Sequence, residues 1–247
     1  KISLIKPYMD TSLEKDVATG RFSQGVLRNG PFRDKFIFYS IGSLGESEGA
    51  EEAVCAYISE FSLSDNCVLV YVLEKPADAA QVNVFVEACY KRIGATKTRE
   101  QRPLLHVMNP DSPLPAEARL VIHKEADCFL CPNYSLNCTS LTIEAVAAQS
   151  TPIINKNTTA YELLGENGSW GVESYEEKCM LNDRSFDDVC TANETCVKPT
   201  IKSLAHKMRE AYTDKFLREK KRADNVKTRQ LLESDAYYDS LKGLLCS

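Results

Sequence analysis

Short apolar segments alternate with longer amphipathic segments from residue 36 to about residue 164, and this alternation constrains the fold of the 247-residue chain more than any other feature. The short segments are apolar at nearly every position, which is typical of strands buried on both faces of a sheet. The longer segments carry apolar residues every three or four positions, which predicts helices that cover such a sheet. The sequence therefore predicts an α/β domain with a doubly wound parallel sheet.

The alternation assigns strands and helices by their spacing. The predicted strands are residues 36–42, 67–73, 104–108, 128–131 and 151–155. The predicted helices are residues 49–61, 79–93, 115–125, 140–148 and 158–164. Two further helical patterns, residues 200–217 and about 221–245, follow near the C-terminal end.

Four regions follow from this pattern. Residues 1–33 are aperiodic and contain glycine, so we expect a tether or a remnant of a preceding domain. Residues 34–175 form the α/β domain. Residues 176–198 are polar and carry three cysteines, which predicts an excursion stapled by disulfides. Residues 199–247 form C-terminal helices that pack on the domain.

Charge and hydropathy exclude two classes of partner. The formal net charge is -5, and no stretch is basic enough to neutralise many phosphates, so we expect no nucleic-acid partner. No apolar run approaches the roughly 20 residues needed to cross a bilayer, so we expect no membrane span. A metal site is also not expected, because only Cys128 and Cys131 have the C-x2-C spacing and the histidines stand apart from them.

The chain combines 10 cysteines with several N-glycosylation sequons. The sequons lie at Asn133, Asn137, Asn157, Asn167 and Asn193. Together they favour the secretory pathway, with an extracellular or particle-surface location, over chance sequons and buried thiols. Because Asn133, Asn137 and Asn157 directly follow predicted strands, glycans there would lie at the carboxyl edge of the sheet.

The cysteines divide into candidate disulfides and candidate buried thiols. Pairing is expected within the group Cys179, Cys190 and Cys196, and Cys131 with Cys138 is a second candidate. Cys55 and Cys89 lie on the sheet-facing sides of predicted helices, which indicates buried thiols.

Several motifs resemble the C-terminal, nucleotide-sugar-binding domain of retaining GT-B glycosyltransferases (glycosyltransferase group 1, family 4-like). The sequence ADCFLCP from Ala126, then SLTIEAVA from Ser140 and TPII from Thr151, resembles that family's signature. Further agreement comes from Gly42 with Gly49 and from the closing helix at residues 199–212. The resemblance covers about residues 34–222 and implies a Rossmann-like half of a GT-B fold.

The resemblance also implies a donor site whose polar residues are largely missing. The family places a basic residue after the first strand and a lysine before the next helix, whereas Ser43 and Glu48 stand there in this chain. Of the family's paired glutamates, Glu144 matches the second, while Leu136 stands near the place of the first. A leucine cannot accept hydrogen bonds from a sugar, and acids near Glu48 repel a diphosphate.

Three functions remain open at this stage. The leading hypothesis is a degenerate, non-catalytic glycosyltransferase-like domain that serves as a glycosylated structural or interaction module, with other protein subunits or carbohydrate as partners. The first alternative is an active retaining glycosyltransferase that transfers a hexose from a nucleotide sugar and lacks its acceptor domain in this chain. The second is a module that binds a nucleotide sugar without turnover. A nucleotide sugar is the only cofactor implied, and only by the alternatives.

Overall fold

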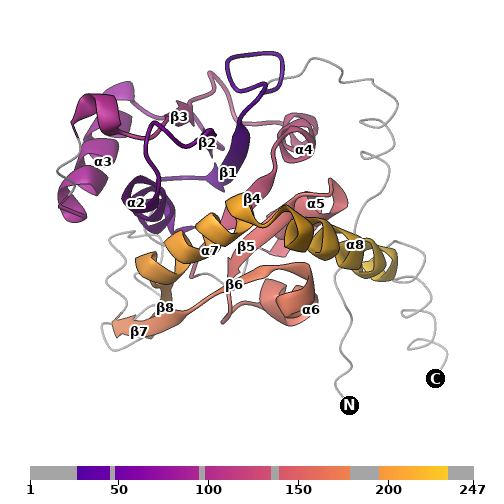
Figure 1. Cartoon of the computed structure of the whole chain (residues 1–247). Helices are drawn as coiled ribbons and strands as arrows, with labels where there is room; N and C mark the ends of the chain where they lie inside the picture. The colour runs from indigo at the N-terminus through magenta and orange to yellow at the C-terminus, as the bar shows by residue number, and fades with distance from the viewer. Residues whose placement is uncertain (1–26, 45–47, 95–97, 135–138, 179–194, 233–247) are drawn as a thin grey trace.

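Six parallel strands form the central sheet, in the order β3-β2-β1-β4-β5-β6 (Figure 1). The computed structural model describes residues 27–44, 48–94, 98–134, 139–178 and 195–232. The strands are β1 (Phe36–Gly42), β2 (Cys67–Leu73), β3 (Leu105–Met108), β4 (Cys128–Cys131), β5 (Thr151–Asn155) and β6 (Trp170–Val172). Because the strand order reverses between β1 and β4, the sheet is doubly wound.

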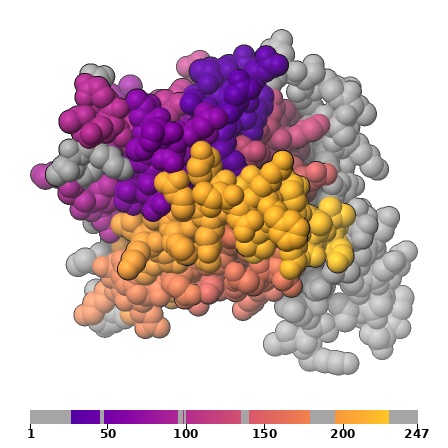
Figure 2. Space-filling model, viewed as in Figure 1, coloured from indigo at the N-terminus to yellow at the C-terminus, as the bar shows by residue number. Residues whose placement is uncertain are grey.

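Helices cover both faces of the sheet. They are α2 (Ala50–Glu60), α3 (Ala79–Arg92), the short 3-10 helix η2 (Arg99–Gln101), α4 (Ala116–Glu125), α5 (Thr139–Ala147), α6 (Thr159–Gly168), α7 (Ile201–Thr213) and α8 (Lys215–Leu232). One face packs against α2, α3 and α7, and the other packs against α4, α5 and α6. In the space-filling view, α7 and α8, coloured orange to yellow, lie across the middle of the visible face (Figure 2). The alternation of β1 side chains between these layers explains why its residues are apolar on both sides: Phe38 belongs to the first core, and Ile37 and Tyr39 to the second.

The predicted α/β architecture is confirmed. The bounds of β1, β2, β4 and β5 agree with those expected from the sequence. On α3, the predicted apolar face is also present, since Cys89 and Tyr90 are buried and Val82, Phe85 and Val86 pack against the core. Strong local periodicity therefore predicted most elements of this domain.

The structure differs from the sequence prediction at three places. The helix expected over residues 200–217 ends at Thr213, because the Asp214 carboxylate accepts a hydrogen bond from the Leu217 backbone N–H at 2.8 Å and begins α8 there. The short edge strand β6 was not predicted. Part of the polar excursion forms an antiparallel pair, β7 (Ser174–Lys178) with β8 (Thr195–Pro199).

The N-terminal segment expected to be a tether is described only from Leu27 onward, and there it packs on the domain. Leu27 is 1% exposed and Phe32 is 8% exposed. The Arg28 guanidinium forms an ion pair with Asp127 at 2.6 Å, and the Leu27 backbone N–H donates to Glu125 Oε2 at 2.7 Å. Residues 27–33 are thus part of the folded unit.

The expected disulfides fall largely outside the described residues. Cys138, Cys179 and Cys190 lie there, so their pairing stays a prediction. Within the described part of the chain, Cys196 is a free thiol and Cys131 donates a hydrogen bond to Asn133 Oδ1. Cys55 and Cys89 are buried thiols, as predicted. No helix in the described ranges combines the length and the apolar character that a bilayer crossing requires.

Candidate functional site

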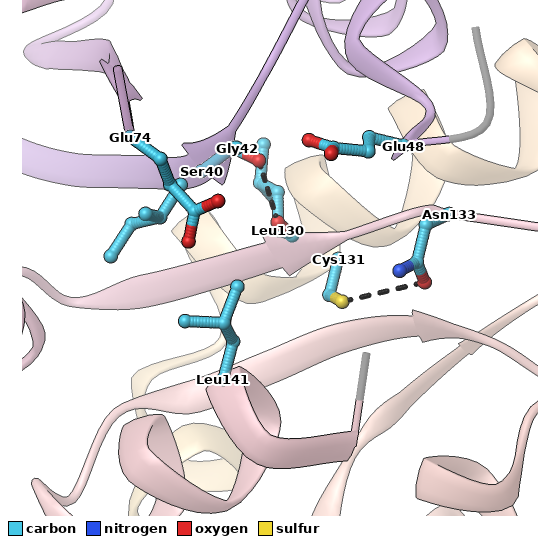
Figure 3. Close-up of a pocket in the computed structure, with 9 residues that line it drawn as sticks. Ser40, Gly42, Glu48, Glu74, Leu130, Cys131, Asn133 and Leu141 are labelled. Atoms are coloured by element: carbon cyan, nitrogen blue, oxygen red, sulfur yellow. Dashed lines mark hydrogen bonds between the residues drawn. The ribbon is translucent and has the colours of Figure 1, made fainter. Parts of the chain in front are cut away.

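A crevice lies at the carboxyl-terminal edge of the sheet, where β1 ends and α2 begins. It contains a cavity of about 70 Å³ (Figure 3). The cavity is lined by Ser40, Ile41, Gly42, Glu48, Glu74, Leu130, Cys131, Asn133 and Leu141. This is the switch point of the sheet, which is where open α/β folds bind ligands. The cavity is small beside the roughly 300–1,000 Å³ of typical ligand pockets.

Glu48 fills the turn between β1 and α2 with its own carboxylate. Glu48 Oε2 accepts a hydrogen bond from the Ser43 backbone N–H and lies so close to Gly42 that a side chain at that position would have to displace the carboxylate. The Tyr71 hydroxyl fixes the same turn by donating to the Ser43 carbonyl at 2.7 Å. The Glu48 carboxylate therefore already binds the backbone N–H group of Ser43, which follows β1.

Gly49 lets this turn approach the end of β4. Its φ of +70° lies in the left-handed region, and an added Cβ would lie 2.8 Å from the Pro132 carbonyl carbon. Only glycine satisfies both conditions without strain. Gly42 and Gly49, which the family resemblance singled out, are therefore both brought to the crevice, and the backbone geometry requires glycine at Gly49.

The charge of the crevice is negative. Glu74 directly follows β2, and Figure 3 shows its side chain across Gly42 from Glu48. None of the described residues that line the cavity is basic. Glu52 lies in the first turn of α2, where burial raises its pKa while the Tyr134 hydroxyl donates to its carboxylate at 2.8 Å. A diphosphate at this place would meet carboxylates instead of cations.

Glu144 does not line the cavity and is bound to other side chains. Arg119 Nε and Nη2 each lie 3.2 Å from one Glu144 oxygen, and His123 Nε2 lies 3.6 Å from Oε2. Burial alone would raise the pKa of Glu144, but the neighbouring His123 and Arg119 lower it. On the other side of the imidazole, His123 Nδ1 is 2.7 Å from the Tyr39 hydroxyl. A ribose at this carboxylate would compete with Arg119 for its oxygens.

The structure places the sequon asparagines in different environments. Asn133 is 3% exposed and its Oδ1 accepts from Cys131, which disfavours a glycan on this side chain in the folded chain. Asn157 and Asn167 are exposed. Asn137, Asn193 and the donor-site position Leu136 lie outside the described residues.

Sequence reasoning missed Glu74, Arg119 and His123. Glu74 had a usable signal, because it is the first residue after a predicted strand and such positions converge at one edge of a parallel sheet. Arg119 and His123 are four residues apart on a predicted helix, hence on one face, but nothing in the sequence indicated that Glu144 would lie opposite them.

The strand order, the helices on both faces and the crevice beyond β1 define a Rossmann-like α/β domain. Comparison with solved structures identifies its fold as that of a C-terminal GT-B glycosyltransferase domain. No known family profile matches the sequence, and no curated protein sequence matches it either.

Among similar structures is an α,α-trehalose-phosphate synthase (UDP-forming) from Burkholderia xenovorans, with a TM-score of 0.67 and 13% identity over 99% of this chain and 52% of the synthase. The trehalose 6-phosphate synthase of Burkholderia multivorans gives a TM-score of 0.64 and 16% identity, over 97% of this chain and 49% of the synthase. The chain thus spans about half the length of the synthases it matches.

Another similar structure is an isolated C-terminal domain whose length is comparable with that of this chain. It belongs to a glycosyltransferase group 1 family protein (LpcC) of Francisella tularensis, with a TM-score of 0.56 and 14% identity over 79% of this chain and 84% of that domain. At these identities the likeness concerns the fold.

Proposed function

We propose that this domain is a glycosyltransferase fold that does not transfer sugar and serves as a structural or interaction module. The observation that carries the proposal is the Glu48 carboxylate, which accepts the Ser43 backbone N–H over Gly42. In a nucleotide-sugar transferase, the leaving diphosphate needs positive or hydrogen-bonding groups at the crevice, and electrostatic stabilisation of that charge is usually the largest catalytic contribution. Here the position is already taken by an anion.

The electrostatic cost of a second anion at this place is large. Two unit charges of the same sign about 4 Å apart repel by roughly 1 kcal/mol in water and roughly 4 kcal/mol at the effective dielectric constant of a protein surface. That range corresponds to a loss of about 5-fold to 1,000-fold in affinity. Glu74 adds to this repulsion from the opposite side of Gly42.

Glu144 supports the same proposal from another direction. Arg119 donates one hydrogen bond to each Glu144 oxygen, so the carboxylate already has a charged intramolecular partner with which a donor ribose would compete. The ion pair that Glu144 on α5 forms with Arg119 on α4 gives this carboxylate a structural role that needs no ligand.

We extend the proposal to the setting of the domain. The exposed side chains of Asn157 and Asn167 suit glycan attachment in the secretory pathway or at an extracellular or particle surface. Other protein subunits or carbohydrate are the proposed partners.

Calorimetric titration with UDP and with UDP-glucose tests the proposal, since the similar synthases are UDP-forming. We expect no binding heat at millimolar ligand for the unaltered chain. Glu48→Lys reverses the charge at the diphosphate place, and Glu48→Gln is its matched control, which removes the charge without adding a cation. We expect measurable UDP binding for Glu48→Lys and little for Glu48→Gln.

Two results would contradict the proposal. Binding of UDP-glucose by the unaltered chain without release of UDP would favour a nucleotide-sugar module. Binding accompanied by UDP release would favour a transferase whose acceptor half lies outside this sequence.

A further inference from the structure

Two fully buried cysteines face each other between neighbouring helices on one side of the sheet. Cys55 lies on α2 and Cys89 lies on α3, and both are 0% exposed. The Cys55 thiol donates to the Cys89 carbonyl at 3.7 Å. The Cys89 side chain lowers the pKa of Cys55, and the Cys55 side chain raises the pKa of Cys89, as expected for neighbouring thiols.

Two other buried thiols have different surroundings. Cys67 Sγ lies 3.6 Å from the Tyr57 hydroxyl, and Cys128 Sγ donates to the Thr151 carbonyl at 3.1 Å. The partners of these two thiols lie on α2 and β5, whereas the Cys55 thiol of α2 contacts Cys89 on α3. The chain therefore contains matched internal controls for any chemistry of the pair.

We propose that Cys55 and Cys89 form a disulfide that joins α2 to α3, with a small disulfide of the oxidised glutathione class as the oxidant. The proposal stands on the packing of these two helices and does not depend on whether the crevice binds a nucleotide. It assigns a covalent modification site in the first core of the domain.

The exchange balances in two steps. The Cys55 thiolate attacks one sulfur of oxidised glutathione, which forms a mixed disulfide and releases one glutathione thiolate. The Cys89 thiol loses its proton to that thiolate and attacks Cys55 Sγ, which releases the second glutathione. Two protein thiols are oxidised to one disulfide, and one glutathione disulfide is reduced to two thiols.

Burial dictates when this reaction occurs. Because neither thiol is exposed in the folded domain, the reaction must take place before α3 closes on α2. Of α3 only Cys89 and Tyr90 are fully buried, while its other core-facing residues are partly exposed and Val84 is 69% exposed, so α3 buries less apolar surface than α2 does. A bond across the 34 positions between the cysteines would restrict the unfolded chain as well as hold α3.

Peptide mapping of the full chain tests the proposal. The chain is denatured, refolded in a glutathione redox buffer, denatured again with a thiol-alkylating reagent present, and digested without reduction. Trypsin alone is insufficient, because no Lys or Arg separates Cys55 from Cys67. A second protease that cleaves after Glu60 places these two cysteines in different peptides.

We expect a linked pair of peptides that contain Cys55 and Cys89, with Cys67 and Cys128 alkylated. The thermal midpoint of the oxidised chain should exceed that of the reduced chain by about 5 to 10 °C. Neither Cys55→Ala nor Cys89→Ala can form this disulfide. The part of the midpoint difference that the disulfide causes should therefore be absent in both variants. The proposal is overturned if Cys55 and Cys89 are both alkylated, if either pairs with another cysteine, or if the midpoint of the mapped, linked chain does not respond to reduction.

Discussion

The two edges of the central sheet carry opposite chemistry. At the carboxyl-terminal edge, Glu48 and Glu74 line a small cavity whose described lining includes no basic residue. At the amino-terminal edge, Lys221 and Arg209 bind carbonyl and carboxylate oxygens of neighbouring elements. The comparison teaches that the cations of the amino-terminal edge hold neighbouring elements together, at the edge opposite the one where folds of this type bind ligands.

Lys221 is the clearest cation of the amino-terminal edge. It is 3% exposed, and its ammonium donates to the Glu166 carbonyl and, at 2.8 Å, to the Ser169 carbonyl, while lying 4.7 Å from the Trp170 ring centre. It therefore satisfies carbonyls at the C-terminal end of α6, where the helix dipole favours a positive charge.

The largest expected effect follows from Lys221→Met, which keeps the length of the side chain and removes its donors. The carbonyls at the end of α6 lose their partner, so we expect the free energy of unfolding to fall by about 3 kcal/mol. Urea denaturation measures the change. Lys220→Met, at an exposed position one residue earlier, is the control and should change it by less than about 0.5 kcal/mol. Equal effects of both variants would contradict the structural role of Lys221.

A smaller effect is expected for Arg209→Met on α7. Arg209 pairs with Glu60 at 2.8 Å and Asp65 at 2.7 Å and lies over the Phe61 ring. Losing these contacts should lower the free energy of unfolding at pH 7 by about 1 to 2 kcal/mol, measured by urea denaturation. Lys202→Met, at an exposed site on the same helix, should change it little.

The effect of Arg209→Met should depend on pH in a defined direction. Burial would raise the pKa of Asp65, but hydrogen bonds from Arg209 and Ser62 outweigh it and lower that pKa. A lowered folded-state pKa gives stabilisation that is present above the unfolded value of about 4 and is lost as the pH falls through the folded value. The difference between the unaltered chain and Arg209→Met should therefore be full at pH 7 and smaller at pH 3. A difference that stays constant would assign the effect to packing.

The smallest expected effect belongs to the carboxyl-terminal edge. In the double variant Glu48→Gln, Glu74→Gln, the charge is removed while an amide oxygen can still accept the Ser43 backbone N–H. We expect the free energy of unfolding to change by less than about 0.5 kcal/mol, with any gain seen at low salt and absent at about 0.5 M salt, because screening removes the repulsion. A loss of more than about 1 kcal/mol would show that these acids stabilise the fold, and the contrast between the edges would fail.

Most of the fold could be predicted because its signals are local. β1 and β2 are runs of seven residues that are buried on both faces and almost entirely apolar, Ser40 being the exception, so their sequence admits few alternatives. β6 has only three residues, too few for a periodic signal, and it exists because β5 offers a pairing edge. The break at Asp214 lies inside a helical pattern that continues to residue 217, and it depends on the Asp214 bond to Leu217 and on Arg218, which donates to carbonyls at the end of α7.

The candidate site was predictable in its position and less so in its contacts. Gly42, Ser43, Glu48 and Gly49 lie within one turn, so sequence spacing alone placed them together. The ion pair between Arg119 and Glu144 joins residues 25 positions apart on different helices, and its formation depends on how α4 and α5 pack. The exposure of a sequon depends likewise on the completed surface, as the contrast between Asn133 and Asn157 shows.

The bond from Lys221 to Ser169 has a consequence for the order in which the protein is made. The two residues are 52 positions apart, so α6 and β6 leave the ribosome well before the ammonium that completes them. During that interval the carbonyls at the end of α6 are left to water, and the sheet edge beside Trp170 lacks its cover. The domain therefore reaches its final state late in synthesis, when α8 emerges and closes it.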